Sequence, residues 1–235
     1  MRYSIDLHNH SCLSPCGENA LLPSLLALEA SEKHLDIVAL TDHNTTGNLP
    51  AFKEAAEIVG ITPVFGMEIS TVEEVHLLAL FETIEEANDF GKFIDKSLIK
   101  FPNDTKLFGD QLIVDVAGNI IDRVDYMLYG PSTLGLDTLV NEIIANKGLA
   151  IPAHIDRNAN SILANLGFIP DLPYSAVEIV DPPIQEDVSK WTIVQGSDAH
   201  YLPHIGRRFC YIESETPDFA GLSRALKEGK VSYRV

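Results

Sequence analysis

Ile37-Val38-Ala39-Leu40-Thr41-Asp42-His43-Asn44 joins four apolar residues to a polar cluster that follows them at once. The apolar half has the length and branching of a buried strand. Histidines or carboxylates follow apolar runs in four further places, at Asp6-Leu7-His8-Asn9-His10, Gly66-Met67-Glu68, Ala153-His154 and Gly196-Ser197-Asp198-Ala199-His200. Side chains at the ends of several strands can meet only if the strands close around a common axis. A TIM-like barrel is therefore favoured over a doubly wound sheet.

The segments between these clusters alternate between strand-like and helix-like patterns. We predict strands at 4–7, 37–40, 63–65, 149–152, 176–180, 192–194 and 209–213, and helices at 22–33, 49–59, 134–146 and 219–228. Such alternation predicts parallel strands covered by helices. Residues 101–130 break the rhythm, and residues 111–121 within them read as a β-hairpin turned near Gly118-Asn119. We therefore expect one α/β barrel domain over residues 1–235, with this hairpin as an insertion or lid.

The composition limits the partners that are expected. Asp and Glu number 34 against 17 Lys and Arg, a net charge of −17. Such a charge argues against stable nucleic-acid binding by general phosphate neutralisation, although a local basic pocket stays open. The sequence has no apolar run of about 18 residues and no leader-like N-terminus, so we expect no membrane contact and, by default, a cytoplasmic location.

Six of the eight histidines lie at or near the ends of predicted strands, at positions 8, 10, 43, 76, 154 and 200. Each alone would more often be a structural histidine, but together they indicate a metal site. His8 and His10 are separated by one residue, so on a strand both point to the same face. Asp198 and His200 repeat that spacing, and Glu68 offers oxygens that can bridge two cations. The mixed set suits zinc, manganese or iron, and its size implies two or three divalent ions.

Together these motifs resemble the polymerase and histidinol phosphatase (PHP) superfamily, and they occur in family order from residue 6 to residue 200. The resemblance implies a distorted (β/α)7 barrel with a trinuclear metal site at the C-terminal ends of its strands. On that model His8, His10, Glu68 and Asp198 hold one ion, Glu68, His76 and His154 a second, and His43 and His200 a third.

Cys16 stands where this sequence departs from the family pattern. The family usually supplies another His or Asp to the third ion a few residues after the paired histidines, but neither stands between Ser11 and Ala20. Three explanations stay open: Cys16 ligates as a thiolate, Glu18 substitutes for it, or the third site is weak. A thiol that merely packs is the alternative to a ligand.

The spacing between Glu68 and His76 constrains the barrel independently of the resemblance. Only seven residues separate them, whereas a parallel crossover needs a dozen or more. If both residues reach the same ion, the strand over residues 76–81 must start at the metal end.

Clustered divalent ions favour hydrolysis of phosphate esters, because they lower the pKa of bound water and neutralise developing charge. We expect a phosphatase or phosphodiesterase that acts on a small molecule or nucleotide through a metal-bound hydroxide, with Asp198 or His200 relaying protons. Arg157 and Arg207 or Arg208 are candidates for phosphate binding, although an exposed arginine is usually only solvated. Asp6 and Asp42 either fix imidazole tautomers or make simple hydrogen bonds. A nuclease-like activity on short nucleic-acid ends and a non-enzymatic metal scaffold are the alternatives.

Overall fold

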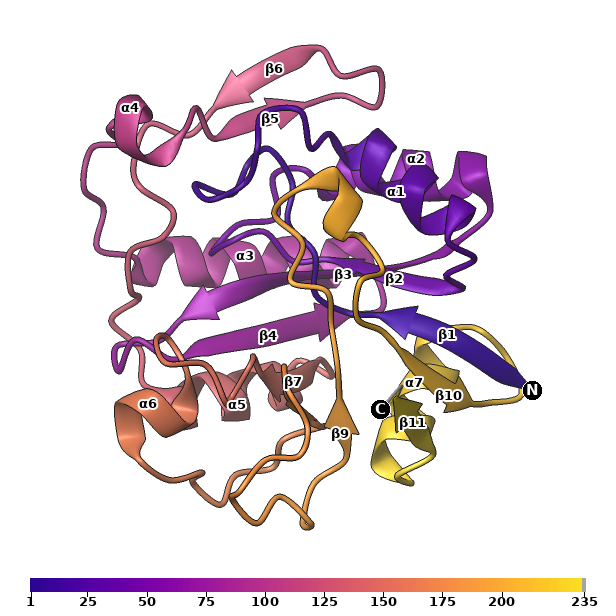
Figure 1. The fold of residues 1–235 in the computed structure, drawn as a ribbon. Coiled ribbons are helices and arrows are strands. Elements are labelled where there is room, and N and C mark those ends of the chain that lie inside the picture. Colours follow the sequence, from indigo (N-terminus) through magenta and orange to yellow (C-terminus); the bar gives the residue numbers. More distant parts are fainter. Residues whose placement is uncertain (234–235) are drawn as a thin grey trace.

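A curled seven-stranded sheet forms the centre of the computed structural model, which describes residues 1–233 (Figure 1). The strand order is β11-β10-β1-β2-β3-β4-β7. The strands are β1 (Arg2–Asp6), β2 (Ile37–Leu40), β3 (Thr62–Ser70), β4 (His76–Phe81), β7 (Leu149–Pro152), β10 (Cys210–Glu213) and β11 (Val231–Tyr233). The predicted α/β fold with a barrel-like sheet is confirmed, in the form of a half-barrel.

Two short parallel strands, β8 (Val177–Glu178) and β9 (Ile193–Val194), lie between β7 and the segment that follows β1. On one side Ser175 N donates to Ala150 O over 2.8 Å, next to β7. On the other, Asp198 N donates to His8 O over 2.7 Å and His10 N donates to Ala199 O over 3.0 Å. These bonds bring the segments after β1, β7 and β9 together.

The expectation of parallel strands is confirmed for β1, β2 and β3 but not for the rest of the seven-stranded sheet. β1, β2 and β3 are parallel, but β4 runs antiparallel to both β3 and β7, and β10 runs antiparallel to β1. The connection between β3 and β4 is too short for a crossover, so β4 begins with His76 at the metal end, as its spacing predicted. β3 extends to Ser70, so Glu68 lies within a strand instead of after one.

The sheet is buried on both sides. Ile37, Ala39 and Val64 pack with β7 and β10 residues in an inner cluster, whereas Val38 and Leu40 pack against the helices. The long helices are α1 (Pro23–Glu32), α2 (Leu49–Val59), α3 (Ile84–Ser97), α5 (Leu136–Ala145) and α7 (Phe219–Lys227). Short turns of helix are α4 (Thr105–Phe108), α6 (Ile162–Leu166) and η1 (Leu202–His204). None of the helices within residues 1–233 is long and apolar enough to span a membrane.

The predicted hairpin consists of β5 (Leu112–Val114) and β6 (Ile120–Arg123), which pair antiparallel. Gly118 has φ +85° in the turn, a conformation that suits glycine. Asp115 accepts hydrogen bonds from the backbone N and side-chain Nδ2 of Asn119. Leu112 N donates to Cys12 O, so the hairpin packs against the loop that follows β1.

Candidate metal centre

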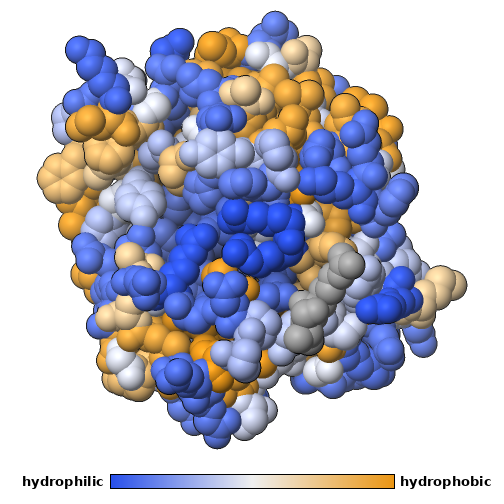
Figure 2. Space-filling view, viewed as in Figure 1, coloured by the Kyte–Doolittle hydropathy of each residue, from blue (hydrophilic) through white to orange (hydrophobic). Residues whose placement is uncertain are grey.

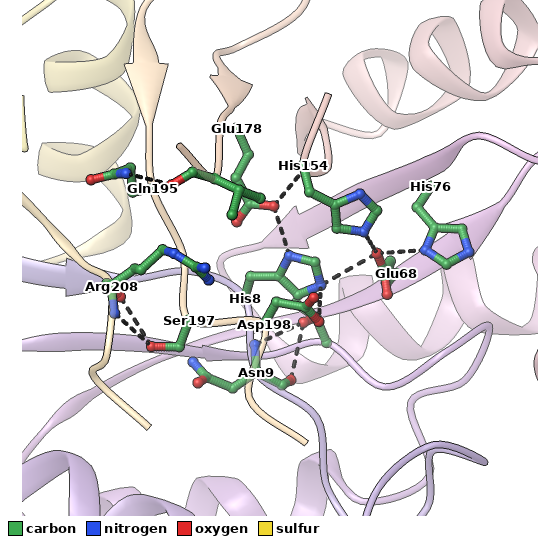
Figure 3. Close-up of polar contacts among 12 residues, drawn as sticks. His8, Asn9, Glu68, His76, His154, Glu178, Gln195, Ser197, Asp198 and Arg208 are labelled. Carbon is green, nitrogen blue, oxygen red and sulfur yellow. Dashed lines mark hydrogen bonds and ion pairs between the residues drawn. The ribbon is translucent and has the colours of Figure 1, made fainter. Parts of the chain in front are cut away.

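The histidines and carboxylates singled out in the sequence converge at one end of the barrel. They come from the segments after β1, β2, β7 and β9, from β3, and from the first residue of β4. His200 is half-buried. The other converging residues are buried: His8, His10, His43, Glu68, His76, His154 and Asp198. Figure 3 shows His8, His76 and His154 directed toward Glu68. In the space-filling view, hydrophilic residues gather across the centre of the face seen in Figure 1 (Figure 2).

The ligand atoms form three overlapping groups, in each of which all atoms lie within 4.8 Å of one another. The groups are His8, His10, Glu68 and Asp198; His43, Glu68 and His76; and His10, His43 and His200. The first contains the residues expected around the first ion. In the second, His43 joins Glu68 and His76, while His154 Nε2 lies 3.1 Å from Glu68 Oε1. The arrangement is consistent with a site for several metal ions.

Hydrogen bonds fix which nitrogen of His8 and of His10 faces the centre. His8 Nδ1 lies 2.8 Å from Glu178 Oε2, a carboxylate that only accepts, so Nδ1 carries the proton. Ser14 Oγ donates to Asp42 and therefore accepts from His10 Nδ1, 3.0 Å away. In the neutral imidazoles the two Nε2 lone pairs then face each other over 3.3 Å. Lone pairs held this close repel each other unless a proton or a metal cation lies between them, so the residues fit bound metal.

Glu68 lies at the centre of the cluster. Its carboxylate is 2.8 Å from His76 Nδ1, and the nearest nitrogens of the other contacting imidazoles lie between 3.1 and 3.3 Å from it: His8, His10, His43 and His154. Burial opposes ionisation, but His76, His8 and His43 hold the pKa of Glu68 well below its usual range. His43 Nδ1 makes its contact with Glu68 Oε2 without the geometry of a hydrogen bond, and within residues 1–233 His154 Nδ1 is buried without a hydrogen-bond partner. An ionised carboxylate among such nitrogens suits a bridge between cations.

The backbone is strained at two of the converging residues. His154 has φ +30° and Asp198 has φ +45°, in a region that non-glycine residues seldom adopt. Each such residue costs about 1–3 kcal/mol and persists only where its surroundings enforce it. The bonds from Asp198 N to His8 O and from His154 N to Glu178 Oε2 supply that constraint.

Two residues that support the cluster were missed in the sequence, Glu178 and Ser14. Glu178 Oε2 accepts from both His8 Nδ1 and His154 N, and Ser14 Oγ contacts both His10 Nδ1 and His43 N. The available signal for Glu178 was a single charge inside the apolar run of residues 176–180. Asp42 reaches His10 only through Ser14.

Asp6 makes simple hydrogen bonds and contacts no imidazole. It accepts from the backbone N–H groups of Ser197 and Gly206, and it thereby ties the segment after β9 to β1. Burial, opposed by these hydrogen bonds, raises the pKa of Asp6 to about 6. Of the two alternatives for Asp6, the structure shows the hydrogen-bonding one.

Arginines border the cluster on the side of Asp198. The Arg157 guanidinium contacts Asp198 Oδ2. Arg207 donates from Nε to Ser197 O over 2.7 Å and from Nη2 to Asp198 O over 3.2 Å. Burial and repulsion from Arg208 lower the pKa of Arg207, and Arg157 adds to this repulsion. The guanidinium groups of Arg157 and Arg207 thus lie beside Asp198, in a chain of net charge −17.

Cys16 is exposed and, like Glu18, belongs to none of the three groups formed by the described residues. The surrounding protein atoms and the charges of Glu68 and Asp198 raise the pKa of its thiol. Its role as a ligand of the third ion therefore stays a proposal.

Cys16→Ser tests that proposal. Because a thiolate binds zinc and iron better than manganese, the substitution is expected to lower metal occupancy and to shift preference toward manganese. It should also reduce sensitivity to peroxide. Metal content and activity measured before and after peroxide treatment check both effects. If metal content, metal preference and peroxide sensitivity stay unchanged, the thiol only packs.

Metal binding is expected to release protons and to strengthen as the pH rises toward about 9. Burial opposes protonation of His10, but hydrogen bonds to Asp198 and Glu68 outweigh it and raise the pKa of His10 to about 9. Below that pH a cation must displace a proton from the imidazole, which costs roughly tenfold in affinity per pH unit for each proton. Calorimetric titrations in buffers of different ionisation enthalpy measure the release. Affinity that is constant from pH 6.5 to 9 would contradict this coupling.

The fold and the site define a class: α/β proteins with a barrel-like sheet and a buried His, Glu and Asp cluster suited to several metal ions. The family model described as the PHP domain matches residues 6–152. The chain therefore belongs to the PHP domain family of metal-dependent phosphoesterases.

Comparisons with individual proteins place the chain beside nucleases and phosphoesterases. It is 36% identical over 80 residues to a 5'-3' exoribonuclease from Salmonella typhimurium, a match that covers 32% of this chain and 26% of that protein. A lesion-specific endonuclease from Pyrococcus furiosus has the same fold, with a TM-score of 0.73 and 17% identity over 99% of this chain and 58% of the endonuclease. A predicted metal-dependent phosphoesterase from Bifidobacterium adolescentis gives a TM-score of 0.58 and 18% identity over 84% of this chain and 87% of that chain. The chain thus spans about a quarter of the exoribonuclease and somewhat over half of the endonuclease.

Proposed function

We propose that this protein hydrolyses phosphate mono- or diesters of a small molecule or nucleotide, with two or three zinc, manganese or iron ions held by the converging ligands. The observation that carries the proposal is the set of ligand nitrogens and oxygens around Glu68, bordered by arginines that contact Asp198 and the backbone beside it. Cations and guanidinium groups side by side suit a phosphate, whose oxygens they bind together.

The ligand set comprises His8, His10, Glu68 and Asp198 for one ion, Glu68, His76 and His154 for a second, and His43 and His200 with Cys16 for a third. When bound, such ions lower the pKa of water toward neutrality and neutralise charge on the phosphate. Arg157 and Arg207 bind phosphate oxygens and orient the ester. Burial lowers the pKa of His200 to about 4, so this imidazole is neutral near pH 7. A neutral His200 can offer a ring nitrogen to a cation, and we propose that His200 or Asp198 relays protons as the ester bond breaks.

A second candidate is hydrolysis at the end of a nucleic-acid strand. The exoribonuclease match favours it. The net charge of −17 opposes extended binding, but Arg157 and Arg207 place two positive charges beside Asp198. We therefore propose that any nucleic-acid substrate is short and is held near its terminal phosphates.

Rates on p-nitrophenyl phosphate, bis-p-nitrophenyl phosphate and a labelled oligonucleotide, each with manganese, zinc or iron, test the proposal. We expect metal-dependent turnover of at least one substrate, abolished by a chelator and restored by metal. The first two substrates separate monoesterase from diesterase activity, and the third detects a nuclease. No turnover on any of them would reject the enzymatic proposal in favour of a metal-binding scaffold.

A further inference from the structure

A small cavity opens directly beside the ligand cluster, on the side of His76. Its volume is about 210 Å³, and it is lined by Ser70, Glu74, His76, Met127, Tyr129, Gly130, Pro131 and Asn160. Pockets for drug-sized ligands usually measure about 300–1,000 Å³. This cavity therefore suits one ring system and not a whole nucleotide.

Ser70 lines the cavity, and its buried hydroxyl is not used by any of the described residues. The residue is 3% exposed, and its Oγ has no hydrogen-bond partner within residues 1–233. A buried hydroxyl without a partner costs free energy, so its presence calls for an explanation. Glu68 and Ser70 are two residues apart on β3 and share a face, and His76 lies opposite Ser70 on β4. The Ser70 side chain thus lies on the same face of β3 as the Glu68 carboxylate.

Tyr129 forms the aromatic wall and also contacts the cluster. Its ring meets the imidazoles of His43 and His76 edge to face, with centroids 4.9 and 5.6 Å apart. Asn160 Nδ2 donates to the Tyr129 hydroxyl, and Asn160 O accepts from His76 N. Asn160 holds this position at φ +55°. The same short segment that carries His154 and Arg157 therefore fixes the tyrosine, the cavity and the ligand cluster relative to one another.

The lining selects the kind of group that fits. Within the described residues the cavity wall contains no Lys or Arg, and Glu74 lies at its exposed rim, so a phosphate would be repelled. Met127, Tyr129 and Pro131 present apolar and aromatic surface instead, while the buried Ser70 and the exposed Glu74 offer hydrogen-bonding groups. A flat heterocycle with polar atoms on its edge matches this pattern, since any nucleobase can stack on an aromatic side chain.

We propose that this cavity binds the nucleobase of the ester that the metal centre hydrolyses, with the ring against Tyr129 and a base edge hydrogen-bonded to Ser70 Oγ. The inference rests on the proposed phosphoesterase function and adds its substrate class, a nucleotide or the terminal nucleotide of a strand.

Two measurements on the metal-loaded protein test the cavity. The first is the ratio of kcat/KM for adenosine 5'-monophosphate to that for ribose 5-phosphate, which keeps the phosphate and sugar but lacks the base. The second is equilibrium binding of adenosine, which has no phosphate, by calorimetry. We expect the nucleotide to be preferred at least roughly tenfold, and Tyr129→Ala or Ser70→Ala to lower adenosine affinity roughly five- to a hundredfold and to reduce the preference.

Control variants separate loss of nucleobase binding from loss of folding and from loss of hydrolysis. Tyr211→Ala, on β10 and outside the cavity, should change neither measurement. Ser70→Ala should keep the thermal midpoint, because its hydroxyl has no partner to lose. If adenosine binds and the variants bind it more weakly while no ester is hydrolysed, the nucleobase site is supported and the proposed phosphoesterase function is rejected. If esters are hydrolysed without preference for the nucleotide, or if the variants bind adenosine like the wild type, the cavity assignment is overturned.

Discussion

Glu68→Gln is expected to lower kcat/KM on the best phosphoester by on the order of a thousandfold, or about 4 kcal/mol, and to reduce metal content. The carboxylate contacts five imidazoles, those of His8, His10, His43, His76 and His154. An amide keeps the size of the side chain but removes the negative charge and one of the two acceptor oxygens. Two ligand groups lose their shared anion at once.

His43→Ala is expected to have a smaller effect, although His43 also belongs to two groups. It removes a neutral donor, since burial lowers the pKa of His43 well below its usual range, and it leaves the group of His8, His10, Glu68 and Asp198 complete. Steady-state rates with metal content measured in parallel compare the two variants. Glu54→Gln, at an exposed position of α2, is the matched control. Equal losses of rate with equal metal retention would argue against a bridging role for Glu68.

Local patterns predicted the elements whose ends are marked by strong sequence signals. α2 and β7 have the predicted bounds, because an amphipathic run before Gly60 and an apolar run after Gly148 determine them locally. α3 was missed, although Thr83 and Glu86 form a capping box at its start. The predicted strands at 176–180 and 192–194 are only two residues long in β8 and β9. Beyond the β8–β9 pair, Ile155 N donates to Glu178 O and Val180 N donates to the Asp156 carboxylate, so tertiary contacts override strand propensity.

The converging residues could be recognised from their positions after strands, but their supports could not. His8 and Glu178 are 170 residues apart in the sequence, and no local spacing relates them. The close approach also depends on Gly196: a Cβ there would lie 2.3 Å from Glu178 Oε1 and 2.7 Å from His8 Cβ. Only the packing of β8 and the segment after β9 against β1 shows why this glycine and this glutamate are needed together.

Glu178→Ala is therefore expected to weaken metal binding roughly ten- to a hundredfold, the range typical of residues that orient metal-binding histidines. The alanine leaves His8 Nδ1–H without its acceptor, so the ring can turn or take the other tautomer, and its Nε2 lone pair is no longer held toward Glu68. It also frees His154 N, which helps to keep His154 at its strained φ.

Glu178→Gln distinguishes orientation from charge. The glutamine oxygen can still accept from His8 Nδ1–H, so a variant that retains most of the metal affinity indicates that the hydrogen bond orients the ring. If glutamine is as damaging as alanine, the negative charge itself makes His8 a stronger donor to the cation. Metal titrations by calorimetry, with thermal midpoints of the metal-free proteins recorded alongside, separate both effects from general destabilisation. Wild-type metal affinity in Glu178→Ala would show that Glu178 only fills space between β8 and β1.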